Sequence, residues 1–490
     1  MTLTSERFDI EFLTVNQLAA TFTKLQSSPN KTIHQHESTE IAIHCLGLMD
    51  KYQALHPYYR DMIAYLKYYG VDSIYDLSWA REVDAKSRET TEFGRERIHD
   101  VTSTTTDALD AKDCHELFDV VKRCIITLFI QRNYSDADYY LNNYATVVQF
   151  STQPKSPEQS RENRYLEYLF LQYSINIFQT IWFEEGKSSI PENKLVTSNS
   201  FKPLDTIFKK VSTYYSKNES LFVGEKTYDE LHFYWIIKIL HLYLLFKQFK
   251  FIEFFDEFTS LFIEYESKGT NLTPLQFFNN DNGAILKSNL LLMFAIVSIF
   301  LKPNCSLSFM NEDALIDLYN ENESSLEFTF YNKVLIPLSK RDLVEVQETL
   351  HSDSVFLDRL VGYLDINFPV SVTFSDSFVE YMRTIIDFKN FLVIMSVTKQ
   401  IPRTRVIELL GYDLSNIELI NKVSNNLIVL VSVLGKTGIQ YLASSELFIR
   451  ENKNNSAIDL QQDLEDLNND VKGMTLSSIM TSILIEKFYN

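Results

Sequence analysis

Few side chains in this sequence are of a kind and at a spacing suited to catalysis or metal binding. His34 and His36 form an HxH pair, a pattern with which some zinc-dependent deubiquitinase sites begin. Such a site also needs an aspartate eleven residues after the second histidine, and Gly47 occupies that position. We therefore expect both histidines to be solvated loop residues, not zinc ligands.

The run Gly435-Lys436-Thr437-Gly438 resembles the end of a phosphate-binding loop, but the earlier glycine of GxxxxGK is missing. Cys114 and His115 are adjacent, so on a helix their side chains diverge and cannot form a catalytic dyad. The acidic residues are spread over expected helix faces. We predict no catalytic site, no metal site and no cofactor, so the chain is not expected to be an enzyme.

Composition favours an all-α protein. The 490 residues include only 12 Gly and 11 Pro, too few for the many turns of a sheet protein, and 36 Phe and 27 Tyr to fill the interior. The cysteines contain no CxxC pair, which indicates reduced, buried thiols; they are Cys45, Cys114, Cys124 and Cys305.

Charge and hydropathy restrict the partners and the compartment. A formal net charge of −19 repels nucleic-acid phosphates and anionic lipids. The longest apolar run, Leu290 to Leu301, is too short to span a bilayer and predicts a buried helix. The first residues, MTLTSERFDIEF, lack the basic and apolar regions of a signal peptide. We expect a protein of the cytoplasm and nucleus without membrane contact and with nucleic acid as an unlikely partner.

Much of the chain reads as helix pairs joined by tight polar turns. Apolar stripes predict one pair over residues 117–128 and 136–144, another over 231–242 and 254–262, and a third over 334–338 and 343–350. Such pairs cannot bury both faces alone and must stack. We predict an N-terminal helical region over 1–110, ending in a loop at the Ser/Thr run 102–106, and a right-handed, TPR-like helical-repeat solenoid over 111–375.

Residues 376–445 predict a winged helix. A helix ending near Ser396, the extended Gln400-Ile401-Pro402, a helix from Arg403 to Leu410 and a third helix ending at Asn425-Asn426 follow one another. The β-branched run 427–433 (LIVLVSV) then predicts a strand, paired through a turn at 434–438 with a second strand at 439–443.

The predicted third helix and wing offer too few cations for a DNA reader. We instead expect an exposed strand edge that docks another protein, with Val429, Val431 and Val433 at the interface.

Residues 446–490 predict a polar spacer and a helix. Its a/d seam needs an apolar partner, either in this chain or in a bundle with helices of other chains. The candidate interface residues of this seam are Leu460, Leu464, Leu467, Val471 and Met474.

From Tyr331 to Leu442 the chain resembles the PCI family. The last helix pairs of a PCI domain are similar to NKVLIPLSKRDLVEVQETLHSDSVFLDRLVGYL, the first winged-helix elements to FVEYMRTIIDFKNFLVIMSVTKQIPRTRVIELLG, and the wing to NNLIVLVSVLGKTGIQYLAS. Many relatives carry an Ile-Asp at the strand end, where this chain has Val431-Ser432. The pair around Asn133 and Asp136 resembles repeats of the largest PCI subunit of the COP9 signalosome and of its proteasome-lid counterpart.

This resemblance implies a non-catalytic scaffold subunit. Its partners would be other PCI subunits and a separate metalloprotease subunit, with a cullin-RING ligase as a further partner, and its role would be to support cullin deneddylation. The alternatives are a subunit of the proteasome lid or of translation initiation factor 3 and, from another class, a winged-helix PCI protein that binds nucleic acid.

Overall fold

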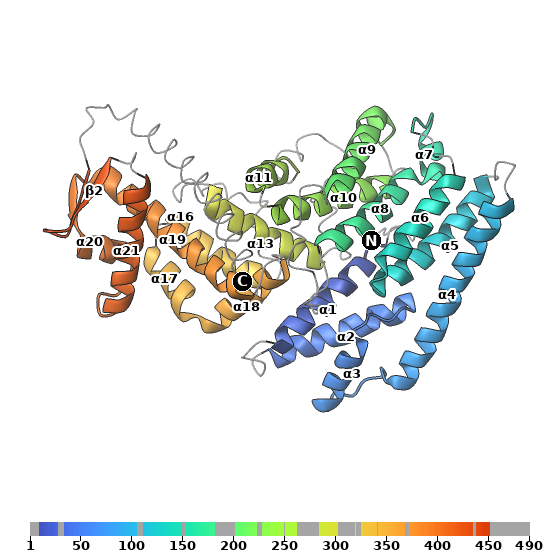
Figure 1. Ribbon diagram of the computed structural model, residues 1–490, viewed down its shortest axis with the longest axis horizontal. Helices are drawn as coiled ribbons and strands as arrows, with labels where there is room; N and C mark the ends of the chain where they lie inside the picture. Colours follow the sequence, from blue (N-terminus) through green and yellow to red (C-terminus); the bar gives the residue numbers. More distant parts are fainter. Residues whose placement is uncertain are drawn as a thin grey trace. The chain divides into compact units, whose positions relative to one another are not determined.

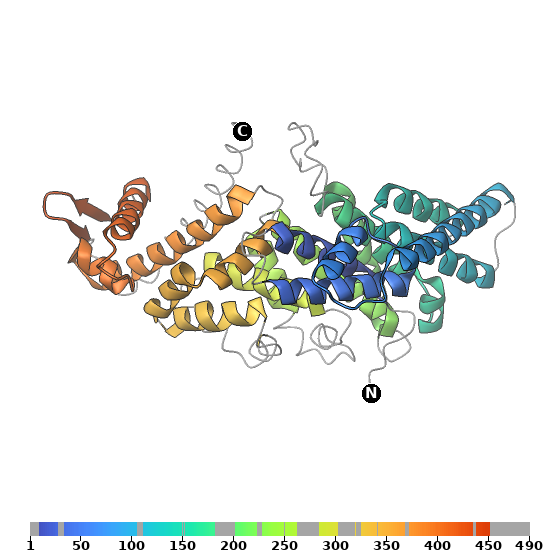
Figure 2. The same cartoon turned by 90° about the horizontal axis from the view of Figure 1, so that it is seen from below.

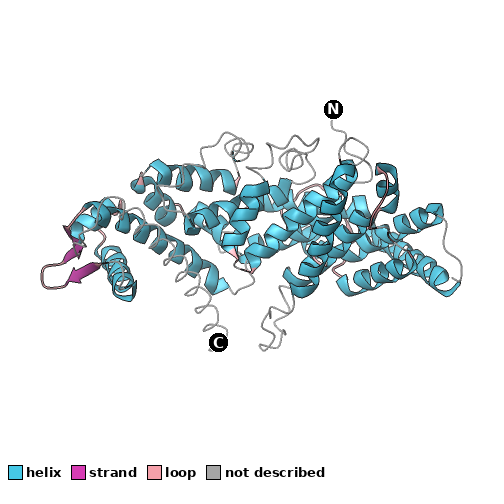
Figure 3. Ribbon diagram, turned by 90° about the horizontal axis from the view of Figure 1, so that it is seen from above, coloured by secondary structure: helices cyan, strands magenta, loops and turns pink. Residues whose placement is uncertain are grey.

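The computed structural model describes residues 9–27, 34–104, 111–148, 150, 152–181, 201–222, 228–248, 250–261, 284–301, 319, 325–340, 342–367, 372–434 and 438–450. Within these ranges the chain is mostly helical, and its strands form one small antiparallel sheet of three strands (Figure 3). This confirms the all-α prediction with a minor β component.

The chain divides into two compact units. The first comprises Met1–Gln248 and Glu257–Lys287, and the second Phe249–Asp256 and Ser288–Asn490. Figure 1 labels the elements of both units along the sequence.

Aromatic packing joins the early and later helices of the first unit. The Phe12 ring of α1 meets Phe129 of α5 edge-on at 5.2 Å between centroids, and Phe170 of α8 at 6.1 Å. Asn16 of α1 donates to the carbonyl of Phe129 at 3.2 Å. The helices up to the end of α10 are α1 (Phe12–Ser27), α2 (Gln35–Tyr52), α3 (Tyr59–Tyr68), α4 (Leu77–Thr104), α5 (Ala111–Ile130), α6 (Tyr134–Val147), α7 (Pro157–Asn163), α8 (Tyr165–Ile181), α9 (Lys202–Asn218), the 3-10 turn η2 (Glu219–Leu221) and α10 (Tyr228–Lys247).

The predicted helix pair over 117–128 and 136–144 is confirmed as α5 and α6. The side chain of Asn133 caps α6 by accepting from the amide of Asp136. The preceding helix α4 continues through Thr104, so the loop predicted from residue 102 is wrong for its first residues. Close packing supports this long helix, because a Cβ on Gly94 would lie 2.8 Å from that of Cys124.

A buried ionic cluster ties α5 to the start of α8 in the first unit. Glu167 is fully buried and accepts from Lys122 at 2.7 Å and from Nε of Arg164 at 2.7 Å. Arg164 also pairs with Asp119 at 2.6 Å and stacks on the Phe118 ring at 4.1 Å. The buried carboxylate therefore has two cationic partners, as a buried charge requires.

In the second unit, the apolar run 290–301 is a buried helix, as predicted. It belongs to α13 (Ala284–Leu301), and the Nζ of Lys389 donates to the carbonyls of Ile299 and Phe300 at its C-terminal end. No helix among the described residues is long and apolar enough to span a bilayer. The short helix α11 (Phe251–Thr259) precedes α13 in the sequence.

The predicted pair over 334–338 and 343–350 is also confirmed. Its first helix comprises α15 (Leu326–Phe330), a π turn η8 (Tyr331–Leu335) and α16 (Ile336–Lys340). The π turn lies just before Pro337, which has no amide to donate and whose ring crowds the preceding turn. The second helix is α17 (Leu343–Ser352), capped by the side chain of Asp342, and α18 (Ser354–Asn367) follows it.

The chain ends, within the described ranges, in a group of elements that we call the terminal module. It consists of α19 (Val372–Val397), β1 (Gln400–Pro402), α20 (Arg403–Leu409), α21 (Ile417–Leu434), β2 (Ile439–Leu442) and β3 (Leu447–Arg450). The hairpin of β2 and β3 projects beside α21 (Figure 2). The second strand of the predicted hairpin, at 439–443, is confirmed as β2, whereas the first is wrong: residues 427–433 are helical, and the hairpin partner of β2 is β3.

Candidate functional site

The terminal module is built around one apolar core. The last turns of α19, the inward faces of α20 and α21, and one face of the sheet meet there. Phe448 lies at its centre, fully buried, with Phe391 of α19 edge-on at 4.8 Å and Tyr441 of β2 at 4.9 Å. The helices and the sheet of the module therefore fold as one body.

The sheet register separates a buried row from an exposed face. In the order β1-β3-β2, Ile401 pairs with Phe448, which pairs with Tyr441 on the core side. The neighbouring row joins Pro402, Leu447 and Leu442, whose side chains point to the other face because strand side chains alternate. β1 and β2 are the two outer strands, and therefore the two edges of the sheet.

Gly411 fixes the terminal module against the preceding helix pair. It follows α20 with φ +87°, a conformation that favours glycine. A Cβ placed there would lie 2.8 Å from the carbonyl carbon of Leu343 and 3.0 Å from the amide of Val344, so the turn after α20 rests directly on the first turn of α17.

A buried polar cluster strengthens the same junction. The carboxylate of Asp387 in α19 accepts from the hydroxyl of Tyr412 at 2.6 Å and from the amide of Gln347 in α17 at 2.8 Å. His351 of α17 lies with its ring 5.6 Å from that of Tyr412. Arg383 of α19 donates to the carbonyl of Leu350 in α17. Side chains from α17, α19 and the α20–α21 turn are thereby linked.

Burial changes the protonation of this cluster. It raises the pKa of the Asp387 carboxyl to about 7, although the hydrogen bonds from Tyr412 and Gln347 and the nearby Arg383 each act to lower it. Burial, followed by the charges of Arg383 and Lys422, lowers the pKa of His351 to about 4. The cluster therefore holds a carboxyl that titrates near neutrality beside a neutral imidazole.

The predicted interface residues 429, 431 and 433 do not form a strand edge. All three lie on α21, which continues through the Asn425-Asn426 pair. Val429 is 58% exposed on its outer side, whereas Val431 is buried in the module core. The helix prevails because Ile420, Val423, Leu427 and Val431 form one buried stripe at helical spacing, and tertiary burial outweighs the β preference of branched residues.

The other predicted interface residues, Leu460, Leu464, Leu467, Val471 and Met474, lie outside the described residues, and so do Lys436 and Thr437. Sequence reasoning missed β3 and its central place in the sheet. The signal that could have revealed it is the short apolar run Leu447-Phe448-Ile449 after the turn-forming pair Ser444-Ser445.

The face of α21 that points away from the core is close to neutral. Its exposed side chains include Glu418 and Lys422, and Lys422 forms an ion pair with Glu380 at 2.7 Å. The turn between β2 and β3 contributes the acid Glu446 and no cation. This face of α21 and the β2–β3 turn thus lack the excess of cations by which proteins bind phosphate backbones.

Among the described residues outside the terminal module, the histidine and cysteine side chains that could bind a metal or act in catalysis are dispersed. His34 is buried beside the start of α2, 3.6 Å from Glu37, so the prediction that it is solvated is wrong. His36 is exposed, as predicted, but lies on that helix and not in a loop. Among the described residues, no group of three or more His, Cys, Asp or Glu side chains could hold a metal ion. Cys45 and Cys124 are buried free thiols, as predicted, and burial raises the pKa of Cys124 to about 12.

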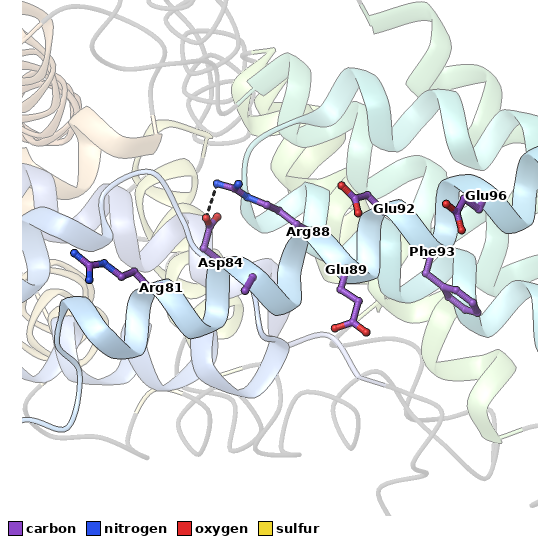
Figure 4. Close-up of a pocket in the computed structure, with 8 residues that line it drawn as sticks. Arg81, Asp84, Arg88, Glu89, Glu92, Phe93 and Glu96 are labelled. Carbon is purple, nitrogen blue, oxygen red and sulfur yellow. Dashed lines mark hydrogen bonds and ion pairs between the residues drawn. The ribbon is translucent and has the colours of Figure 1, made fainter.

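A shallow depression follows the outer face of α4 (Figure 4). All of its lining side chains come from that single helix, at helical spacing, with Arg81, Asp84 and Arg88 towards one end and three glutamates near the exposed ring of Phe93. Asp84 and Arg88 pair within it at 2.6 Å. Without a second wall, this face has the geometry of a solvated helix surface and not of a ligand site.

Comparisons with known proteins give no direct assignment. No protein-family model matches the chain, and no curated protein sequence matches it significantly. The order of its elements and its surfaces are therefore the features from which a function can be inferred.

Proposed function

We propose that the chain is a non-catalytic scaffold subunit of a multi-subunit PCI complex, with the COP9 signalosome as the first candidate. In that role it would sit in the cytoplasm and nucleus beside other PCI subunits. It would support cullin deneddylation by a separate metalloprotease subunit.

One observation carries the proposal, namely the order of elements in the terminal module. Helix, strand, helix, helix and two further strands, with β3 between β1 and β2, is the order of a winged helix. The junction at Gly411 and Asp387 joins this module to α17 of the preceding helix pair, which is compatible with a helical repeat that runs into a winged helix. The helix pairs of the first unit favour the solenoid interpretation of the upstream chain.

The sheet offers the surface that such a subunit would use. β2 is an outer strand, and an outer strand can extend its sheet with a strand from a neighbouring subunit. Leu442 on β2 is exposed, and Leu447 beside it is half-buried. The near-neutral face of α21 argues against the nucleic-acid-binding alternative.

The test is affinity purification of the tagged full-length chain from its own cells, followed by mass spectrometry. We expect PCI subunits and one metalloprotease, and accumulation of neddylated cullin when the chain is deleted. Recovery of proteasome-lid or initiation-factor subunits would keep the scaffold role but change the complex. A chain that purifies alone as a monodisperse monomer would refute the proposal.

A point variant tests the sheet edge. Leu442→Lys places a charge on the outer strand, where lysine opposes strand pairing, and should abolish recovery of at least one neighbouring subunit. Leu77→Lys is the matched control, because Leu77 is an exposed leucine on α4 of the other unit. Equal recovery of all subunits with both variants would eliminate the β2 edge as a docking surface.

A further inference from the structure

Four large aliphatic side chains are exposed around the turn that joins α20 to α21. Leu409 ends α20 and is 41% exposed, Leu414 lies in the turn at 45%, and Ile417 begins α21 at 69%. Val344 in the first turn of α17 is 54% exposed, and its amide lies beside Gly411 of the same turn. We call these four residues the junction patch.

The junction patch lies on a rigid support. Gly411 rests on α17, and the neighbouring Tyr412 is held by the buried carboxylate of Asp387. Asp413 orders the turn by accepting from the amide and the hydroxyl of Ser415, and Asn416 caps α21 by accepting from the amide of Leu419. A surface fixed in this way is preorganised, so a partner would lose little free energy in ordering it.

Exposed acidic residues lie close in the sequence to the members of the patch. The exposed acids within four residues of its members, apart from Glu408, are Asp342, Glu345, Glu348, Asp413 and Glu418. Hydrogen bonds from Ser415 lower the pKa of Asp413, which keeps its carboxylate charged. The nearby described cations are the exposed Lys340, four residues before Val344, and Arg405 and Lys422, which pair with Glu408 at 2.5 Å and with Glu380 at 2.7 Å; the acids still outnumber them. The described rim therefore has a net negative charge.

We propose that the junction patch docks an amphipathic helix of another protein, one with aliphatic residues on one face and Lys or Arg at its flanks. An apolar centre with an acidic rim is complementary to that chemistry. The patch is formed by helix ends and a turn, with no strand to extend, so a helix laid on its apolar face is the mode of recognition that fits. The rim opposes a second copy of the same patch and an anionic membrane. The proposal is independent of the scaffold role, because it rests on the exposure and charge of these residues.

The probe is a fluorescein-labelled synthetic peptide with leucines at helical spacing and flanking lysines, measured against the full chain by fluorescence anisotropy. The comparison peptide has the same leucines with glutamates in place of the lysines. We expect the lysine peptide to bind, the glutamate peptide to bind at least about tenfold more weakly, and added salt to weaken the first complex.

Ile417→Asp locates the site. It should weaken binding of the lysine peptide by about tenfold or more, since it removes an aliphatic side chain that the bound peptide would bury. Val397→Asp is the matched control, because Val397 is 82% exposed in the same module but lies at the end of α19, and it should change binding by less than about twofold. Circular dichroism must show that both variants are folded, and Glu418→Lys supplies a second, charge-based variant that should also weaken binding.

Three results would overturn the proposal. An equal loss of peptide affinity with Ile417→Asp and Val397→Asp would mean that the peptide binds the acidic protein without a defined site. Concentration-dependent dimerisation in sedimentation, lost in Ile417→Asp, would assign the patch to a second copy of the chain. Binding of anionic phospholipid vesicles that depends on Ile417 would assign it to a membrane surface.

Discussion

Replacing Gly411 by alanine tests how tightly the terminal module rests on α17. Two separate costs act at this position. The backbone has φ +87°, and holding a residue with a side chain in the left-handed region costs about 1–2 kcal/mol. The new Cβ would also lie 2.8 Å from the carbonyl carbon of Leu343 and 2.9 Å from its oxygen.

The second cost is the close contact between the new Cβ and the backbone of α17. It is larger than that of a collision with a side chain, because backbone atoms of a helix cannot rotate away. Overpacking of this kind costs about 1–3 kcal/mol. Together the two effects should lower the free energy of unfolding of the second unit by about 2–5 kcal/mol. Gly438→Ala is the matched control, since Gly438 has φ +63° and no described atom within 4 Å of its Cβ position, and it should carry only the backbone cost.

Hydrogen exchange followed by mass spectrometry is the suitable assay. Trp79 and Trp235, the tryptophans among the described residues, lie in the first unit, so their fluorescence does not probe this junction directly. Gly411→Ala should increase exchange in α17 and α20 at urea concentrations at which Gly438→Ala remains protected. Equal exchange in the two variants would refute the claim that the turn after α20 is in direct backbone contact with α17.

Three further predictions concern charge and assembly. The folded-state pKa of Asp387, about 7, lies above the ordinary value of about 4, so the fold becomes less stable as pH rises through that interval and Asp387 ionises. Asp387→Asn should therefore gain thermal stability relative to the wild type between about pH 5 and about pH 8. A difference in melting temperature that does not change with pH would contradict this. Glu167→Gln leaves Lys122 and Arg164 without their buried partner and should destabilise the first unit by about 3–5 kcal/mol, measured by urea unfolding followed through tryptophan fluorescence; a loss below about 1 kcal/mol would show that the cluster is solvated. Deleting residues 459–490 should leave the circular dichroism spectrum and melting temperature of the remaining chain intact but abolish assembly, and an intact complex would rule out a role of this segment in a multi-chain bundle.

The helices and their pairing could be predicted because their signals are local. The stripe of Leu117, Val121 and Cys124 has a helical period, and Asn133 is a residue type that caps the following helix. The buried helix over 290–301 followed from its apolar length alone. The predictions that failed concern residues whose local structural preference conflicts with the contacts that they make to distant parts of the chain.

The run 427–433 is the clearest case of such disagreement. Its branched residues prefer strands, and the preceding Asn425-Asn426 pair weakens a helix, but Leu427 and Val431 continue the buried stripe of Ile420 and Val423. Burial of this stripe against Phe391, Ile401 and Phe448 outweighs propensity differences of a few tenths of a kcal/mol per residue.

Local sequence patterns predict that this protein is helical, that its helices pair through short polar turns, and that residues 439–442 are extended. The tertiary structure places β3 between β1 and β2, because the pairing of Ile401 with Phe448 joins residues far apart in the chain. It also decided that Gly411, Asp387 and Tyr412 form one junction with α17. Local patterns report which residues prefer to be buried, whereas the partner against which each is buried depends on contacts that form only when distant elements meet.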